Sequence, residues 1–230
     1  MKPHVTCLML SSIDGRLHPS RYTQSPDGTT AQWSTVYEGL HDDLAADAWM
    51  VGRVTMAEMS KTAAHAPPSP ATPDRPVHVA HPADSFAIAL DPSGKLHFET
   101  GSIGGDHVIV LLGGDVSDAH LAELVADSVS YIVADGGEID IAAALEQLGT
   151  VFGIRTILLE GGGGINGQLL AAGVVDALSV LVTPALDGGK DVQGITMFDD
   201  GLAGTVKLTL KDAKVLDHGI VHLSYGVEPA

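Results

Sequence analysis

The segment TILLEGGGGINGQLL, residues 156–170, indicates how the chain folds. A short apolar run ends at Glu160, four glycines follow, and the residues from Ile165 onward have helical spacing. A buried strand that leads through glycines into a helix is typical of α/β proteins. In such folds ligands collect beyond the carboxyl ends of strands, where helix starts present unpaired N–H groups. The segment therefore predicts an anion-binding junction next to a carboxylate.

The four glycines allow two interpretations. Glycine is needed where a phosphate must approach the backbone closely, since a Cβ would intrude, but a tight turn with positive φ needs glycine as well. Residues 162–167 also match G-x-G-x-x-G, the fingerprint of NAD-binding Rossmann units. A Rossmann site requires an acidic residue at the end of the following strand. Here that strand, DALSVLV (176–182), leads into Thr183-Pro184 instead. A standard Rossmann site is therefore not expected.

Composition limits the class of protein. With 230 residues, 45% of them hydrophobic and only 18% charged, the chain can bury a substantial core in one large domain. The net charge of −17 disfavours nucleic acid and anionic membranes as partners, although a small anionic ligand remains possible in a local pocket. No segment approaches the roughly 20 apolar residues of a membrane span, and the N-terminal apolar run is too short for a signal peptide. We therefore expect a cytoplasmic protein, with its single cysteine, Cys7, buried in a strand.

Strand-like and helix-like segments alternate along most of the chain. The repeated units predict a mainly parallel sheet with helices on both faces, one continuous domain over residues 1–230, and an antiparallel C-terminal hairpin. The helix near residues 33–45 is expected to bury one face, made of Trp33, Val36, Tyr37, Leu40 and Leu44. The Pro-rich stretch 65–76 must be a loop. The expected strands are 4–10, 47–52, 85–90, 107–112, 128–134, 156–160, 176–182, 205–216 and 219–227, and the other helices are 53–59, 118–127, 139–149 and 165–173.

Two further strand ends carry polar groups. At DAWMVGRVTMAEM (47–59), Gly52 ends a strand, and Arg53 and Thr55 open a helix. A guanidinium and a hydroxyl beside free N–H groups suit an anion, and an arginine suits the 2′-phosphate of NADP rather than NAD, although Arg53 could equally be a surface residue. In SSIDGRL (11–17) the pair Asp14-Gly15 reads as a turn at the end of the first strand, where a substrate pocket is expected.

No metal site is expected. The 11 histidines are scattered, and the closest pair, His78 and His81, would face opposite sides of a strand-like segment. The sequence has no G-x-S-x-G elbow, no P-loop and no cysteine cluster. Hydrolase, NTPase and zinc-site interpretations therefore lack support.

The blocks SSIDGRL, QW, DAWMVGRVT, DPSG and ILLEGGGGINGQLLAAGVVDALSVLVTPALDGG, in this order, span nearly the whole chain. Together they resemble the C-terminal reductase domain of bacterial riboflavin-biosynthesis deaminase-reductases, part of the dihydrofolate reductase-like superfamily. The resemblance implies an NADPH-dependent reductase with a three-layer fold and a mixed sheet of about nine strands, usually a homodimer. It also implies hydride transfer to a C=N or C=O bond of a small heterocyclic substrate.

The resemblance assigns site residues position by position. Ser12, Asp14 and Glu160 correspond to residues that line the substrate pocket, and Asp14 and Glu160 are the candidate catalytic groups that could supply a proton. Together with Gly52 and Arg53, the candidate cofactor contacts are Trp33, Thr55, Ser93, Gly161, Gly162, Gly163, Gly164, Ile165, Asn166 and Gly167.

Residues in two regions depart from the pattern of the riboflavin enzymes. Ala31 stands where they tend to have serine, and Asp42 and Asp43 stand in the region where they place an arginine for the substrate's phosphate. An aspartate would repel a phosphate. A dihydrofolate or pterin reductase on the same scaffold, and a nucleotide-binding protein without turnover, are therefore the alternatives.

Overall fold

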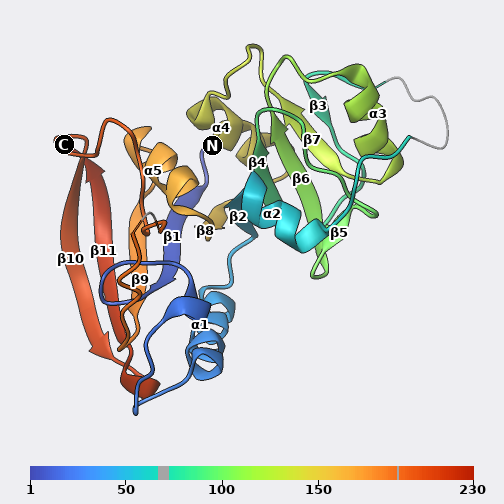
Figure 1. The fold of residues 1–230 in the computed structure, drawn as a ribbon. Coiled ribbons are helices and arrows are strands. Elements are labelled where there is room, and N and C mark those ends of the chain that lie inside the picture. Colours follow the sequence, from blue (N-terminus) through green and yellow to red (C-terminus); the bar gives the residue numbers. More distant parts are fainter. Residues whose placement is uncertain (67–72, 191) are drawn as a thin grey trace. The chain divides into compact units, whose positions relative to one another are not determined.

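The structure is a computed structural model that describes residues 1–66, 73–190 and 192–230 (Figure 1). The predicted Pro-rich loop lies partly outside the described residues, since it includes 67–72. The chain divides into two compact units, each built from two separate stretches. Unit 1 comprises Met1–Pro3 and Asp47–Ile157, and unit 2 comprises His4–Ala46 and Leu158–Ala230. The expectation of a single domain over residues 1–230 stays a prediction.

Unit 2 is built on parallel central strands with an antiparallel hairpin at one edge. Its strands follow the order β10-β11-β9-β1-β8, and Figure 1 shows the long hairpin strands β10 and β11 side by side. Strand β1 runs parallel to β9, with Cys7 opposite Leu178, whereas β11 is antiparallel to both β9 and β10. The elements are β1 (His4–Ser11), β8 (Thr156–Leu159, which begins in unit 1), β9 (Ala177–Val182), β10 (Val206–Val215), β11 (Val221–Pro229), helices α1 (Thr30–Leu44) and α5 (Gly163–Ala171), and the 3₁₀ turns η1 (Pro19–Arg21) and η2 (Asp217–Gly219).

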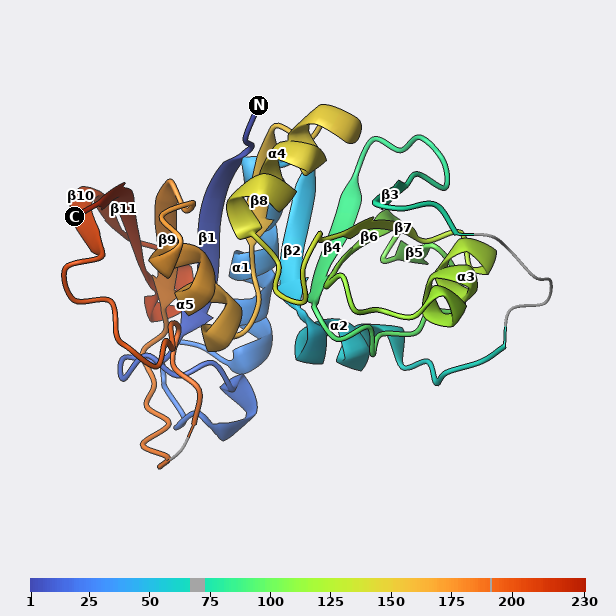
Figure 2. The ribbon, with the colours of Figure 1, turned by 90° about the horizontal axis from the view of Figure 1, so that it is seen from above.

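Unit 1 is a parallel sheet with short antiparallel additions. Strands β2, β4, β6 and β7 pair in parallel one after another, while β3 is antiparallel to β7 and β5 is antiparallel to β6. Every residue of β4 and β7 is buried, as expected for parallel strands that are covered on both faces. The elements, many of them visible in Figure 2, are β2 (Ala48–Gly52), β3 (Val77–His78), β4 (Phe86–Asp91), β5 (Ser102–Ile103), β6 (Asp106–Leu112), β7 (Ser130–Val133), α2 (Arg53–Ser60), α3 (Asp118–Ala126) and α4 (Ile141–Val151).

The predicted fold class is confirmed. The sheet is mixed and mainly parallel, with helices on both faces and antiparallel C-terminal strands. The described residues form eleven strands, of which nine have four or more residues, close to the number that the resemblance implied. The predicted helix at residues 165–173 begins two residues earlier, at Gly163, because the backbone already turns helical within the glycine run.

The predicted buried face of α1 is correct except at its end. Trp33 forms a core cluster with Leu181, Ala185 and Ile220, and Val36, Tyr37 and Leu40 pack against this cluster. Leu44 is 41% exposed, so its assignment to the buried face was wrong. The helix ends there, because Ala45 takes a left-handed conformation that closes the last turn.

Cys7 is fully buried in β1, as predicted. Its burial, and then the nearby charge of Glu160, raise the pKa of the thiol to about 12, so it stays protonated and unreactive near neutral pH. None of the helices in the described part of the chain is long and apolar enough to cross a membrane.

Candidate active site

Glu160 follows the last residue of β8 and is held by two side chains from α1. Its Oε1 accepts a hydrogen bond from the Tyr37 hydroxyl at 2.7 Å, and His41 Nδ1 lies 2.9 Å from the same oxygen. Residues four apart on a helix lie on the same face, so one turn of α1 supplies both groups. The side chain of Glu160 is only 11% exposed, against 34% for His41. The carboxylate is therefore fixed in orientation and largely shielded from solvent.

The contacts of Glu160 leave one oxygen available. Burial and the negative charge of Glu160 raise the pKa of Tyr37 well above 10, so the phenol remains a hydrogen-bond donor. Among the described residues no hydrogen bond reaches Oε2 of Glu160. This oxygen can therefore accept a hydrogen bond from an N–H or O–H group of a ligand.

Asp14 lies in the turn after β1 and is held by a set of hydrogen bonds. The Ser12 hydroxyl donates to Oδ1 at 2.6 Å, and the backbone N–H groups of Asp187 and Gly188 donate to the carboxylate at 3.1 and 2.8 Å. The hydrogen bond from Ser12, followed by those from the backbone, lowers the pKa of Asp14 to about 2. Asp14 is therefore a charged anchor for the loop that follows β9. This environment favours an orienting role over proton donation, and a catalytic role for Asp14 stays a prediction.

Two of the glycines before and within α5 are required by packing. A Cβ on Gly163 would overlap the carbonyl oxygen of Gly194, and a Cβ on Gly167 would overlap that of Met197. The segment 194–197 thus lies directly against the first turns of α5, and the backbone N–H of Met197 donates to the carbonyl of Gly163 at 2.8 Å. Gly162 has φ of +66°, a conformation that favours glycine.

Neither close packing nor a positive φ requires glycine at position 164. It is exposed, and a Cβ placed on it would meet no atom within 4 Å. Its neighbours are inward-facing: Ile165 is buried, and Asn166 is fully buried, with Nδ2 donating to the carbonyl of Ile195 at 2.7 Å. The fold therefore explains Ile165 and Asn166 as packing residues, and their predicted contacts with a cofactor stay predictions. Packing therefore does not explain the glycine at position 164.

The five α-helices of the described residues differ in how they begin. Side chains cap α1, α3 and α4, through Thr29, Ser117 and Asp140. In contrast, α2 and α5 begin at Gly52 and Gly162, and neither helix has a side-chain cap. An uncapped helix start leaves N–H groups without a side-chain acceptor, and these can bind an anion. The two uncapped helices are those that the sequence indicated as anion sites.

The candidate residues of unit 1 lie at the ends of β2 and β4. Arg53 and Thr55 are half-buried in the first turn of α2. Ser93 is exposed in the turn after β4, where its hydroxyl donates to the buried Asp91 at 3.1 Å. Their assignment to the cofactor stays a prediction.

Trp33, in unit 2, is a core residue. It is only 2% exposed, and its indole N–H donates to the carbonyl of His218 at 3.1 Å. Packing in the core is enough to explain this large aromatic side chain, and no ligand contact is needed. The predicted cofactor contact of Trp33 stays a prediction that this burial disfavours.

Tyr37 and His41 were not predicted as site residues. Tyr37 was assigned to the apolar face of its helix, and His41 was not singled out. Their spacing of four residues was the available signal, but a partner on β8 could not be identified from it. Asp42 and Asp43 are exposed on the last turn of α1, so they do not share the inward position of His41.

Comparison with known proteins identifies the family. Residues 3–222 match the RibD C-terminal domain. The chain belongs to the RibD C-terminal domain family. A curated relative from Methanothermobacter thermautotrophicus, 2,5-diamino-6-ribosylamino-4(3H)-pyrimidinone 5′-phosphate reductase, is 28% identical and matches 96% of this chain and 97% of its own length. The reductase of the same name from Kluyveromyces lactis is 31% identical over 54% of this chain and 48% of its own length.

Solved structures show the same fold in RibD-type proteins. A pyrimidine reductase-like protein from Corynebacterium diphtheriae has a TM-score of 0.71 and 19% identity, with 99% of this chain and 93% of that chain covered. The RibD protein of Acinetobacter baumannii has a TM-score of 0.64 at 19% identity, and this chain covers 58% of its length. The riboflavin biosynthesis reductase Rib7 of Saccharomyces cerevisiae has a TM-score of 0.60 at 18% identity, covering 98% of this chain and 90% of that one.

Proposed function

We propose that this member of the RibD C-terminal domain family is an NADPH-dependent reductase that acts on a ribosylaminopyrimidinone 5′-phosphate in riboflavin biosynthesis. The activity is that named for the two curated relatives, one of which aligns with nearly the whole chain. The observation that carries the proposal is the position of Glu160. Its carboxylate, held by Tyr37 and His41, directly precedes the glycine-led, uncapped start of α5. A charged group of the substrate can pair with Glu160, and an anionic group of the cofactor can bind at the start of α5.

The residues present fit a nicotinamide cofactor. The uncapped start of α5 offers backbone N–H groups to a phosphate, and the open space at Gly164 allows close approach to the backbone. Within unit 1, Arg53 at the uncapped start of α2 supplies a guanidinium of the kind that suits a 2′-phosphate group. When bound, NADPH supplies the hydride that reduces the C=N or C=O bond.

The residues of this chain supply orientation and a proton. Oε2 of Glu160 accepts a hydrogen bond from the substrate and so orients it. His41, 2.9 Å from Oε1, is the group that can return a proton to the carboxylate, and it is open enough to exchange protons with solvent. Tyr37 fixes the rotamer of Glu160 from the buried side.

A pterin or dihydrofolate reductase is the second candidate. The observation that favours it is the acidic pair Asp42 and Asp43, on the turn of α1 where the riboflavin enzymes place a phosphate-binding arginine. The two aspartates are exposed rather than directed to Glu160. They therefore disfavour binding of a phosphorylated substrate but do not exclude it.

An assay of NADPH oxidation separates these functions. The ribosylaminopyrimidinone phosphate, dihydrofolate and a simple cyclic imine are each offered to the purified chain, and NADPH binding is measured in parallel by a thermal shift. The proposal expects saturable turnover with the pyrimidinone phosphate. Turnover with dihydrofolate alone would favour the second candidate. Binding of NADPH without turnover on any substrate would indicate a non-catalytic nucleotide-binding protein.

The predicted homodimer has a candidate interface on β10. Nine of its ten residues are exposed, including Leu208 and Leu210, which are 50% and 56% exposed. Residues two apart on a strand point to the same face, so these leucines form one apolar strip. We assign this strip to contact with a second copy of the chain. Light scattering should give a dimer for the native chain and a monomer for Leu208→Lys combined with Leu210→Lys. A native monomer at micromolar concentration would contradict the assignment.

A further inference from the structure

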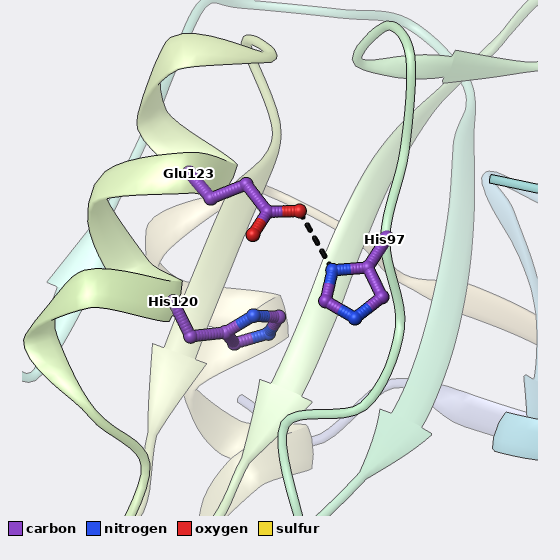
Figure 3. A group of neighbouring side chains, drawn as sticks. All are labelled: His97, His120 and Glu123. Carbon is purple, nitrogen blue, oxygen red and sulfur yellow. Dashed lines mark hydrogen bonds and ion pairs between the residues drawn. The ribbon is translucent and has the colours of Figure 1, made fainter. Parts of the chain in front are cut away.

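Unit 1 contains a cluster of histidine and carboxylate side chains that the proposed reaction does not use. Figure 3 shows His97, from the loop after β4, pointing toward His120 and Glu123 on α3. His120 and Glu123 are three residues apart and therefore share one face of the helix. Candidate ligand atoms of the three residues all lie within 4.8 Å of one another.

The three side chains converge as the ligands of a metal site do. His97 Nδ1 lies 2.6 Å from Glu123 Oε1, and the rings of His97 and His120 are perpendicular, with centroids 5.4 Å apart. His120 is only 8% exposed, and its Nε2 is buried. This nitrogen nevertheless has no hydrogen-bond partner among the described residues. Buried polar atoms are nearly always satisfied, so an unpaired imidazole nitrogen in this cluster points to a missing partner.

The charge of the cluster supports a cation as that partner. Glu123 is 5% exposed, and among the described residues its ion-pair partners are histidines only, His97 at 2.6 Å and His65 at 3.3 Å. His65 in turn contacts Asp127, at the end of α3, at 3.0 Å. A buried carboxylate is costly unless it is paired with a cation or coordinated by a metal. Neither lysine nor arginine supplies that charge in the described part of the cluster.

The geometry points to a binding site for one divalent transition-metal ion of the Zn²⁺ type, with His97, His120 and Glu123 as ligands; we propose this as a structural site. Two imidazoles and one carboxylate are a ligand set that zinc accepts, with the fourth position left to water or to His65. Metal–ligand bonds of about 2.0–2.1 Å would open the His97–Glu123 separation to about 3.3 Å in a tetrahedral site. A small shift of the His97 loop is enough for this change.

The expected effect of the ion is to tie the loop after β4 to α3. The loop carries His97, and the helix carries the other two ligands, so binding would cross-link two segments that sequence separates by more than twenty residues. The sequence spacing gave no sign of the site because the ligands come from different elements. Since none of the three residues is assigned to the reductase reaction, binding and turnover can be measured separately.

The test is metal binding to the full, untagged chain after dialysis against a chelator. Calorimetry with ZnCl₂ should give one site per chain, and Co²⁺ should give the intense visible absorption of a four-coordinate site. Zn²⁺ should also raise the melting temperature by several degrees. His97→Asn and Glu123→Gln should each weaken binding by about 100-fold or more. His4→Asn, which alters an exposed histidine of unit 2, is the matched control and should bind as the native chain does.

Two results would overturn the site. One is the absence of saturable Zn²⁺ binding to a folded native chain. The other is native affinity in both His97→Asn and Glu123→Gln, which would place the ion elsewhere. Circular dichroism of each variant establishes that it is folded, and the half-buried His97 position keeps at least one variant informative if Glu123→Gln does not fold. Failure of the reductase assay would leave this result unaffected, because the readouts are affinity, absorption and melting temperature.

Discussion

His41 Nδ1 lies 2.9 Å from Glu160 Oε1, so a titratable ring on α1 directly contacts the carboxylate at the end of β8. Tyr37, one turn earlier, donates to the same oxygen and leaves Oε2 for a ligand. This arrangement gives Glu160 two separate functions. In the proposed reaction, Oε1 is fixed by the protein and receives a proton from His41, while Oε2 accepts a hydrogen bond from the substrate.

Glu160→Gln should remove both functions with little change in shape. The amide has the size of the carboxylate but carries no charge and cannot relay a proton, so we expect kcat/KM to fall by about 10²-fold or more. NADPH affinity, measured by a thermal shift, should change little. Unchanged turnover in a folded Glu160→Gln variant would remove Glu160 from the mechanism.

His41→Asn tests the proton route. We expect kcat to fall by about 10²-fold, with a smaller effect on KM, because the substrate contact through Glu160 Oε2 is retained. Glu38→Gln, on the exposed side of the same helix, is the control and should behave as the native chain. Native kcat in a folded His41→Asn variant would exclude His41 as the donor.

Gly164→Ala and Gly163→Ala separate ligand approach from packing. A Cβ at Gly164 meets open space, so we expect unfolding free energy to stay equal or rise by up to about 1 kcal/mol, while KM for NADPH increases. A Cβ at Gly163 overlaps the carbonyl of Gly194, so this variant should lose about 1–3 kcal/mol of stability. Native KM for NADPH in Gly164→Ala would mean that the cofactor does not approach the start of α5.

The lowered pKa of Asp14 predicts how the stability of the chain depends on pH in the acid range. Its pKa is lowered from 3.8 to about 2 in the folded chain, so the folded state favours the ionised form. The stabilisation is present above the unfolded pKa of 3.8 and is lost as the pH falls through the folded pKa of about 2, because below that pH the carboxylate is protonated in both states. The difference in melting temperature between the native chain and Asp14→Asn should therefore be constant above about pH 5 and shrink below pH 4. A difference that does not change with pH would show that the hydrogen bonds to Asp14 contribute nothing through its charge.

The sequence predicted the elements well because apolar periodicity and glycines mark them locally. The run before Glu160 predicted β8, and the glycine run predicted where α5 begins to within two residues. Leu44 shows the limit of this reasoning: helical spacing placed it on the buried face, but the left-handed Ala45 ends the helix and leaves it exposed. Apolar periodicity alone does not show where a helix ends when no glycine or proline marks the end.

The site was predictable only in part, since its other half comes from distant segments. Glu160 was indicated by its place at the end of a strand, whereas its partner His41 lies on α1, 119 residues earlier in the sequence. The packing role of Gly163 and Gly167 was hidden for the same reason, because their neighbours, Gly194 and Met197, lie about thirty residues further along the chain. Short-range patterns identify a strand end, but they do not identify what is packed on it.

The most direct test of the account is transfer of label from NADPH that carries deuterium at the transferable position of nicotinamide C4. The chain is incubated with this cofactor and the ribosylaminopyrimidinone phosphate, and the product is examined by mass spectrometry. We predict one deuterium per product molecule, at the carbon of the former C=N or C=O bond, and a loss of labelled product in Glu160→Gln. Oxidation of the cofactor with no deuterium in the product, or no product at all under saturating NADPH, would contradict the account.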